Sequence, residues 1–444
     1  MGLAEIIAGF GNTFYTLVAF VIALSIIVAI HEYGHYIVGR WSGIKAEVFS
    51  LGFGPVLWSR ADKHGTVWQV AALPFGGYVK FLGDANASST GDDGTLGEMD
   101  ATTLRQTMHG APLWARAATV AAGPIFNFIL SIIVFGLLAL YVGGVKTPVE
   151  IASQKPMPPA YAALEAGDIL LEVAGNPIEI FSDVAENHEE MPQNATVQYV
   201  VERNGQQIEV DGPFPLPPMV GSVTIRSAAE AAGLQVDDVI TAIDGTPIDT
   251  FSELQAIAVA SEGRELKLDV WRGGEELEFA FKTKKGIVQT EDGFEERWLI
   301  GMSGGIPFEP AIGPLGVGEA FSRGVSQTYG VIANSFGAIK SMVVGDISTC
   351  GISGPLGIAR ASGATARMGL TNFIYFIAVI STAVGLLNLF PIPVLDGGHL
   401  VFHAYEAVTR RKPGEKALQI LMFIGLAIIL SLLVFGLTND ITCP

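Results

Sequence analysis

The chain has 444 residues, of which 50% are hydrophobic and only 16% are charged, and its formal net charge is −18. This composition indicates a membrane protein with soluble parts, and the length predicts more than one domain. The excess of acidic residues is concentrated between residues 144 and 330, which argues against nucleic acid as a partner. The two cysteines form no CxxC motif, so a thiolate metal site of that type is excluded.

The first apolar run extends from Phe14 to Val38 and is long enough to cross a bilayer. It contains the motif His31-Glu32-Tyr33-Gly34-His35. His31 and His35 lie one helical turn apart, so both imidazoles can bind one zinc ion. Glu32 can then act as general base toward the metal-bound water. Because ionisable groups at membrane depth are costly, the motif predicts a functional site within the first helix, residues 1–43.

Basic residues follow this run at Arg40 and Lys45, and none precedes it. By the positive-inside rule, the N-terminus is expected outside, with HEYGH near the cytoplasmic end of the span. Residues 44–112 are predicted to form cytoplasmic β-structure, with a turn at 62–65, followed by a mobile loop over 84–100. The β-region is either a plain hairpin or a sheet whose free edge pairs with an extended substrate.

A second span is predicted over 113–143. Its Asn127 needs a hydrogen-bond partner, which is either a neighbouring helix or the active site. A soluble, acidic stretch follows, in which one pattern recurs at a spacing of about 70 residues. Each copy has a helix start rich in small residues, a glycine, an acidic residue, an aliphatic strand and a turn. The repeat predicts two tandem α+β modules over 144–217 and 218–286.

Residues 287–370 are expected to form an outer linker. Apolar residues recur in it at intervals of three and four: Phe321, Val325, Tyr329, Ile332, Phe336, Ile339 and Val343. This spacing predicts an amphipathic helix, which lies either on the outer membrane surface or against the two modules.

A third span is predicted over 371–400, ending in Pro391, Pro393 and the sequence Asp396-Gly397-Gly398-His399. A catalytic zinc held by two histidines needs a third protein ligand and an open position for water. Asp396 is the preferred third ligand because it is the acidic residue at the cytoplasmic end of this span. His399 is the competing candidate.

A basic loop over 401–416 and a fourth span within 417–444 complete the predicted fold class, a polytopic α-helical membrane protein with four transmembrane helices. Both termini are then expected outside. Cys350 and Cys443 also fall on the outer side, where they either form a disulfide or stay unpaired.

These motifs occur in the order that is typical of bacterial site-2 proteases, which the chain resembles over nearly its whole length. The resemblance rests on HEYGH, on GPIFNF at 123–128, on the two modules and on NLFPIPVLDGGH at 388–399. It implies Zn2+ bound by His31, His35 and Asp396, with Glu32 as catalytic base. It implies substrate binding by Asn388, Asn127 and the membrane-associated β-region at Gly52, Phe53 and Gly54. The modules resemble PDZ domains, which would either bind peptides by strand addition or restrict access by size.

The resemblance further implies an intramembrane zinc metalloprotease of the bacterial inner membrane. Its partners would be the lipid bilayer, peptide termini at the PDZ-like modules and single-span membrane proteins of the anti-sigma factor type, with remnant signal peptides as further substrates. Such cleavage belongs to regulated intramembrane proteolysis in the envelope stress response. One alternative is a membrane-anchored cytoplasmic zincin with a distant Glu ligand, against which the Asp396 motif argues. Another is a PDZ scaffold with a degenerate metal site, against which the intact HEYGH argues.

Overall fold

The computed structural model describes residues 3–84, 97, 99–158, 164–186, 188, 191–224, 227–290, 293–345, 349–351 and 353–442. The chain divides into two compact units. The helical unit comprises residues 1–139, 317–336 and 352–443. The β-rich unit comprises residues 140–316 and 337–351, together with Pro444.

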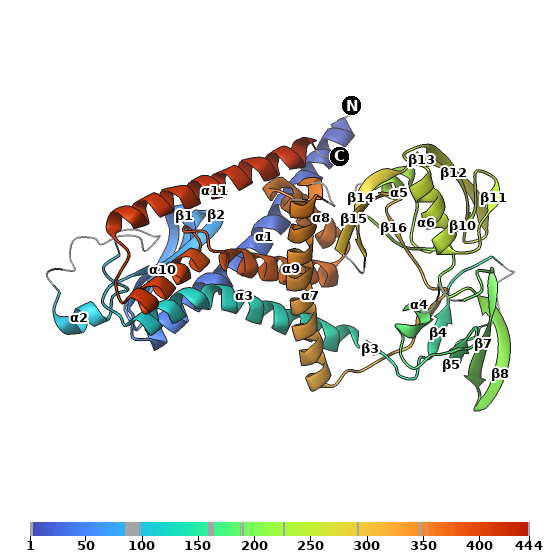
Figure 1. Ribbon diagram of the computed structural model, residues 1–444, viewed down its shortest axis with the longest axis horizontal. Helices are drawn as coiled ribbons and strands as arrows, with labels where there is room; N and C mark the ends of the chain where they lie inside the picture. Colours follow the sequence, from blue (N-terminus) through green and yellow to red (C-terminus); the bar gives the residue numbers. More distant parts are fainter. Residues whose placement is uncertain are drawn as a thin grey trace. The chain divides into compact units, whose positions relative to one another are not determined.

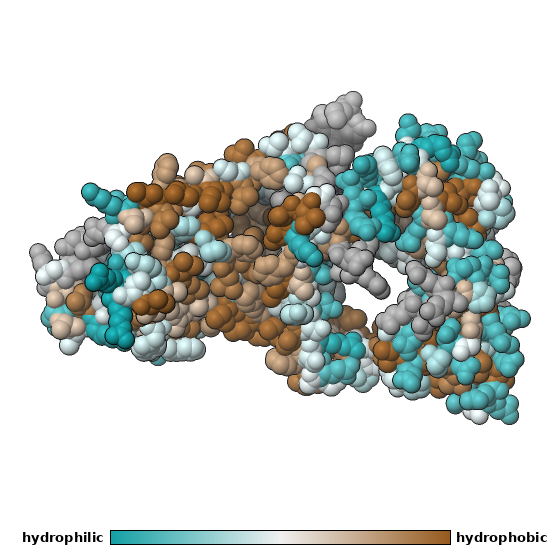
Figure 2. All heavy atoms as spheres, in the orientation of Figure 1, coloured by the Kyte–Doolittle hydropathy of each residue, from teal (hydrophilic) through white to brown (hydrophobic). Residues whose placement is uncertain are grey.

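Within the described residues, four helices of the helical unit are long and apolar enough to cross a membrane, as the sequence predicted. Figure 2 shows hydrophobic residues spread over the visible face of these helices, as expected for surfaces that face lipid. The four are α1, α3, α9 and α11 in Figure 1, with bounds Leu3–Trp41, Leu113–Val142, Leu370–Asn388 and Glu415–Thr442.

Close backbone packing joins α1 to α3. A Cβ on Gly34 would contact the carbonyl carbon of Ala122 at 2.9 Å, so only glycine permits this approach. Between the two helices in the chain stands an antiparallel hairpin of β1 (Ala46–Ala61) and β2 (Val67–Phe81). Its turn lies at 62–66, close to the predicted position.

The remaining elements of the helical unit are short helices and one long helix. They are α2 (Ala101–Arg105), most of α7 (Val317–Val344), α8 (Pro355–Arg367) and α10 (Asp396–Thr409). Thus α7 contains the predicted amphipathic helix. In contrast, α10 occupies most of 401–416, where a basic loop was expected. The loop is confined to the residues between Thr409 and Glu415. Before it, apolar residues recur at the spacing of a helix, so this stretch forms α10 instead of a loop.

The β-rich unit contains two modules with the same sheet topology. The first has strand order β6-β5-β7-β8 and the second β11-β10-β12-β13. A register shift falls between Leu170 and Glu172 in the first sheet and between Ile240 and Ala242 in the second, which is the same place in both. The bounds are β5 Ile169–Val173, β6 Asn176–Pro177, α4 Asp183–Glu186, β7 Thr196–Arg203, β8 Gln206–Pro213, β10 Val239–Ile243, β11 Thr246–Pro247, α6 Phe251–Ala260, β12 Glu265–Arg272 and β13 Glu275–Lys282.

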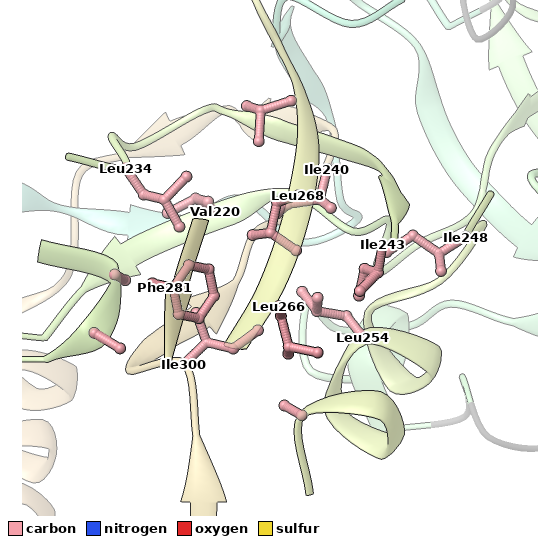
Figure 3. Close-up of a cluster of buried hydrophobic side chains, with 14 of the residues drawn as sticks. Val220, Leu234, Ile240, Ile243, Ile248, Leu254, Leu266, Leu268, Phe281 and Ile300 are labelled. Carbon is pink, nitrogen blue, oxygen red and sulfur yellow. The ribbon is translucent and has the colours of Figure 1, made fainter. Parts of the chain in front are cut away.

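Each module encloses its own apolar core. In the second module, alternate residues of β12 point inward, so Leu266, Leu268 and Val270 are buried in the same apolar cluster. Figure 3 shows Leu266 and Leu268 in this core together with Ile240 and Leu254. Full burial of each such side chain stabilises the fold by about 1.5–3 kcal/mol.

The predicted module boundaries are too short, because a later segment completes both modules. Strand β16 (Met302–Gly304) pairs with β9 (Val220–Val223) of the second module. Strand β17 (Phe308–Pro310) pairs with β4 (Ile151–Gln154) of the first. The expected linker over 287–370 therefore begins with structural strands. The other elements of this unit are β3 Gly144–Val145, α5 Ala228–Ala232, β14 Lys284–Thr290, β15 Gly293–Leu299 and β18 Ile312–Gly313.

Three expectations involve residues outside the described ranges. The loop over 84–100 falls largely there, as does the helix start of the first module at 159–163. Cys350 lies in a 3-10 helix (Thr349–Gly351) and is disulfide-bonded, while its expected partner, Cys443, lies outside the described residues.

Candidate metal centre

His31 and His35 project from α1 toward α3 and face each other. Their Nε2 atoms are 3.2 Å apart. Gly123 of α3 lies against both rings, and a Cβ there would come within 2.8 Å of His31 Cε1 and closer still to His35. A glycine is therefore required at this position for the two imidazoles to converge.

The Nδ1 atoms of both histidines contact α3. His35 Nδ1 lies 2.8 Å from the carbonyl oxygen of Thr119, to which its N–H donates. This bond leaves the Nε2 lone pair of His35 free for a metal. His31 Nδ1 lies 3.1 Å from the side-chain nitrogen of Asn127, whose buried Oδ1 has no hydrogen-bond partner within the described part of the chain.

Asp396 reaches the same place from the first turn of α10. Its Oδ2 lies 3.1 Å from His31 Nε2 and 3.5 Å from His35 Nε2. The preceding turn folds tightly, and a Cβ on Gly398 would contact Pro393 Cα at 2.5 Å. The two prolines prevent α9 from continuing, and the two glycines allow α10 to start against the turn.

These three side chains have the geometry of a metal site. One ligand atom from each lies within 4.8 Å of the others. Two Zn–N bonds of about 2.0–2.1 Å at the tetrahedral angle separate their nitrogen atoms by about 3.3 Å, close to the spacing of the histidines. Asp396 Oδ2 is buried against the two imidazoles, and no hydrogen bond from another of the described residues reaches it. A cation between the three groups would therefore satisfy it. The donor set therefore fits zinc.

Glu32 lies beside this cluster, where α1 meets β2. It interacts electrostatically with His31, His35 and Asp396, and its carboxylate accepts a hydrogen bond from the backbone of Val79. A Cβ on Gly77 would lie 3.1 Å from Glu32 Cγ. The absence of a side chain at Gly77 thus leaves room for the Glu32 carboxylate beside β2.

The predicted substrate-binding residues differ in whether they contact the metal cluster. Asn127 contacts His31, as described above. Gly52 and Gly54 have φ of +90° and +85° and interrupt the regular pairing of β1, and Phe53 stacks on Tyr78. The side chain of Asn388 donates to the carbonyl of Val384 in its own helix, at 3.1 Å. Among the described residues, no hydrogen bond joins Asn388 to the metal cluster.

His399, the competing candidate, is not one of the three clustered residues; Asp396 is. Thr119, Gly123 and Gly77 were not predicted as site residues. Thr119 acts through its backbone carbonyl and the two glycines through a missing side chain, so their residue types gave no chemical signal. The adjacent glycines in Pro74-Phe75-Gly76-Gly77 indicated a close backbone approach, without identifying Glu32 as the neighbour.

Comparison with known proteins identifies the family of the chain. The sequence model of Peptidase family M50 matches residues 19–432. The chain therefore belongs to Peptidase family M50, the site-2 protease family. This confirms the resemblance drawn from its motifs, and the chain is an enzyme of the peptidase class.

Relatives match over nearly their whole length. A protein of Agrobacterium fabrum, provisionally named a zinc metalloprotease, is 35% identical over 437 residues, covering 96% of this chain and 95% of the relative. A Rhizobium meliloti protein with the same provisional name is 35% identical over 431 residues, covering 97% of each chain. The regulator of sigma E protease of Haemophilus influenzae is 32% identical over 461 residues, covering 96% of this chain and 98% of the relative.

Proposed function

We propose that the chain is an intramembrane zinc metalloprotease that cleaves single-span membrane proteins. The observation that carries this proposal is the convergence of His31, His35 and Asp396 on one point, with Glu32 beside it. Two of these ligands come from the apolar helix α1, and the third is the first residue of α10, directly after the turn that follows α9. A hydrolytic site among such helices suits substrates that are themselves in the membrane.

In this proposal, His31, His35 and Asp396 would hold the zinc ion. When bound, zinc would supply an activated water and polarise the substrate carbonyl. Glu32 would accept a proton from that water and deliver it to the leaving amine. Thr119 and Asn127 keep both imidazoles oriented so that their Nε2 atoms point inward.

A substrate helix must unwind before its carbonyls become accessible, and an unwound strand in lipid needs hydrogen-bond partners. In this proposal, the stretch of β1 around Gly52, Phe53 and Gly54, where the register of its pairing with β2 shifts, is where such a strand pairs. Two apolar side chains further along β1, Leu57 and Trp58, are 70% and 55% exposed. Their exposure suits contact with lipid or with an apolar substrate. Asn388 is the further candidate for substrate binding.

The two modules of the β-rich unit are PDZ-like in this proposal and inspect substrates by peptide binding or by size. Basic residues at Arg40, Lys45 and 410–416 set the cytoplasmic side, so both termini and the modules lie outside the bacterial inner membrane. The resemblance to site-2 proteases supports substrates of the anti-sigma factor type, with remnant signal peptides as a second group. One relative is named a regulator of sigma E protease.

The decisive experiment compares wild type with Glu32→Gln in detergent micelles, using a single-span helical substrate with and without a zinc chelator. Glu32→Gln should bind zinc as wild type does and lose about 10²–10⁴-fold in cleavage rate, which is the usual contribution of a general base. Glu47→Gln is the matched control, because Glu47 pairs with Lys80 on the hairpin, away from the metal ligands. Cleavage by Glu32→Gln at the wild-type rate would refute the assigned role.

A further inference from the structure

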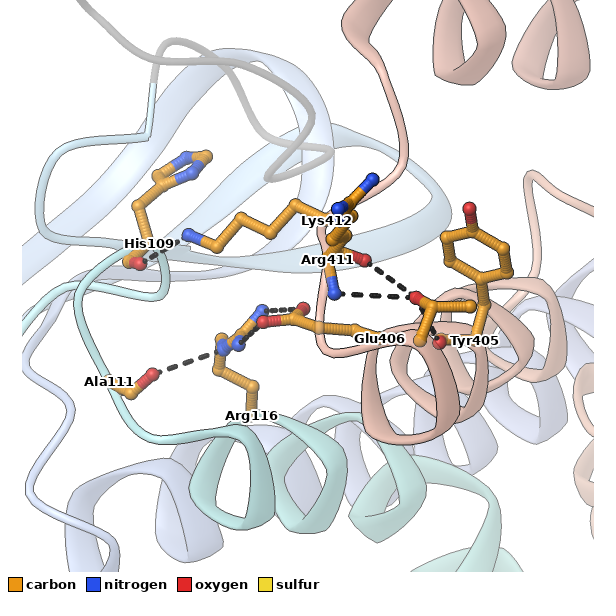
Figure 4. Close-up of polar contacts among 8 residues, drawn as sticks. His109, Ala111, Arg116, Tyr405, Glu406, Arg411 and Lys412 are labelled. Carbon is orange, nitrogen blue, oxygen red and sulfur yellow. Dashed lines mark hydrogen bonds and ion pairs between the residues drawn. The ribbon is translucent and has the colours of Figure 1, made fainter.

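A largely buried ion pair connects α10 to the start of α3 (Figure 4). Arg116 donates two parallel hydrogen bonds to Glu406, one from Nη1 to Oε2 at 2.9 Å and one from Nη2 to Oε1 at 2.7 Å. The two side chains are 11% and 17% exposed. Arg116 Nε also donates to the carbonyl of Ala111 at 3.1 Å, which fixes the plane of the guanidinium. Such a bidentate pair defines direction as well as distance.

Stability alone does not explain this pair, because burying two charges costs about as much free energy as their attraction returns. Both partners are nevertheless charged at neutral pH. The hydrogen bond from Arg116 lowers the pKa of Glu406. Burial and the charge of Arg116 lower the pKa of His403, one turn away on α10, to about 4. His403 is therefore neutral and does not compete with Arg116 for Glu406.

The position of the pair determines what it can control. Asp396 is the first residue of α10, and Glu406 follows ten residues later on the same helix. At about 100° per residue, the two side chains point about 80° apart around the helix axis. Because a helix is stiff against twisting, fixing the direction of Glu406 fixes that of Asp396. A rotation of α10 by about 20° would move a carboxylate lying about 6 Å from the axis by about 2 Å, whereas metal–ligand distances tolerate about 0.2 Å.

Arg116, the other residue of the pair, lies on α3, the helix whose Thr119 and Asn127 orient both histidines. Arg116 lies one turn before Thr119, whose carbonyl binds His35, and α3 also carries Asn127 against His31. Helix α3 thus positions all three candidate ligands. It contacts the two histidines directly, and it holds Asp396 in place through the ion pair between Arg116 and Glu406.

We propose that the Arg116–Glu406 ion pair sets the rotation of α10 and thereby holds Asp396 in register with His31 and His35. Both are positioning residues, since neither touches the metal cluster. This inference rests on the proposed zinc site.

The test measures zinc affinity of the purified full-length protein in micelles, by competition with a chromophoric chelator, together with thermal unfolding of the zinc-free protein. Glu406→Gln removes the charge but keeps the shape, and it should weaken zinc binding about 10-fold, as is typical for outer positioning groups. The exchange of both residues, Arg116→Glu with Glu406→Arg, should restore part of the affinity. Glu319→Gln removes a carboxylate from an exposed pair with Arg323 on α7 and should leave zinc affinity unchanged.

A double-mutant cycle with Asp396→Ala separates positioning from general stabilisation. If Glu406 acts through Asp396, Glu406→Gln causes no further loss of zinc affinity once Asp396 is absent. An undiminished loss in that background, or wild-type affinity in Glu406→Gln alone, would overturn the inference. Should Glu406→Gln fail to fold, Arg116→Lys, which keeps the charge and loses the bidentate geometry, answers the same question. Absence of zinc binding by the wild type would instead overturn the proposed function.

Discussion

The contact between Asn127 and His31 specifies a tautomer. A histidine that binds a metal through Nε2 carries its proton on Nδ1, so its partner there must accept a hydrogen bond. The Asn127 side chain presents its nitrogen to His31 Nδ1, at 3.1 Å, while none of the described residues donates to its buried Oδ1. Rotating the carboxamide by 180° exchanges these two atoms, which are nearly the same size. The rotated amide satisfies both its own oxygen and the Nδ1–H of His31, so the metal-bound state favours that orientation.

The zinc affinity of variants at Asn127 should therefore follow the strength with which the new side chain accepts a hydrogen bond from the Nδ1–H of His31. Asn127→Ala removes the acceptor and should weaken zinc binding about 10–100-fold, whereas Asn127→Asp keeps it and should bind at least as tightly as wild type. Affinity is measured by chelator competition. Ser131→Ala is the control, because the single Ser131 hydroxyl hydrogen is shared between the backbone carbonyls of Asn127 and Ala378, at 2.9 and 2.8 Å, and the side chain makes no hydrogen bond to His31, His35 or Asp396 among the described residues. Equal affinities for Asn127→Ala and wild type would contradict this assignment.

A second residue, Asp62, predicts a pH dependence of the hairpin. Burial opposes its ionisation, but hydrogen bonds from Trp68 and Tyr36 and from the backbone of His64 and Thr66 outweigh this and lower its pKa from 3.8 to about 2. A lowered pKa means that the folded state favours the carboxylate. The stabilisation is thus complete above pH 3.8 and is lost as the pH falls through 2.

Asp62→Asn should accordingly reduce the free energy of unfolding at pH 7 by about 1 kcal/mol, because solvent screens part of the stabilisation of this partly exposed carboxylate. The difference from wild type should shrink as the pH approaches 2. Denaturant titrations of both proteins at several pH values measure this. Asp211→Asn, at an exposed strand position in the β-rich unit, is a control for the loss of one acidic charge. A difference that stays constant with pH would contradict the role of Asp62.

At the level of elements, α8 has no cap of its own and takes one from α11. Asp440 accepts hydrogen bonds from the backbone N–H groups of Gly354, Leu356 and Gly357, at 2.9, 3.0 and 3.0 Å. These are donors that the first turn of a helix leaves unsatisfied. The carboxylate also lies at the positive end of the α8 dipole. The contact fixes the start of a helix that packs against α1, where Tyr15 donates to Ala366.

Loss of this cap should loosen α8. Asp440→Ala should cost about 1–3 kcal/mol of stability, because it removes a cap and leaves buried donors unpaired. Asp440→Asn retains an acceptor and should cost less. Thermal unfolding gives the stability, and hydrogen exchange at residues 354–357 locates the effect. Unchanged exchange at those amides in Asp440→Ala would rule out the capping role.

The sequence predicted long elements better than short ones. Four apolar runs identified α1, α3, α9 and α11, because spans in lipid need a composition that is visible in one stretch. In contrast, α8 is rich in Gly and Ala and has no apolar run, and its cap comes from a residue 83–86 positions away in the chain. The motifs identified His31, His35, Glu32 and Asp396 as candidates, since their chemistry lies in the side chains. The supporting roles of Gly123 and Gly77 depend on tertiary proximity and were not predictable from one sequence.

At the level of the whole molecule, the duplication extends to a buried ion pair. Asp168 pairs with Arg203 in the first module and Asp238 with Arg272 in the second, with N–O distances of 2.7 and 2.6 Å. Each aspartate is fully buried just before the first sheet strand, and each arginine ends the strand beside it. The sequence showed the repeat through its glycines and acidic residues. It did not show that residues 300–310 return to both modules, because those contacts are far apart in the chain.

The segment at 300–310 places a different side chain in the core of each module. Phe308 is fully buried in the first module, and Ile300 is 5% exposed in the second. Because the two cores are largely separate, truncation of either residue should loosen one module only. Phe308→Ala should cost about 3–5 kcal/mol and Ile300→Ala about 2–5 kcal/mol of local stability.

Hydrogen exchange measures the two effects independently. Phe308→Ala should accelerate exchange in β5 and β7 and leave β10 and β12 protected, and Ile300→Ala should do the reverse. Leu216 provides the internal comparison, because it packs against both cores, so Leu216→Ala should accelerate exchange in all four strands. If Phe308→Ala and Ile300→Ala each opened both modules, the two copies would form one cooperative unit, and the segment at 300–310 would be a shared core element.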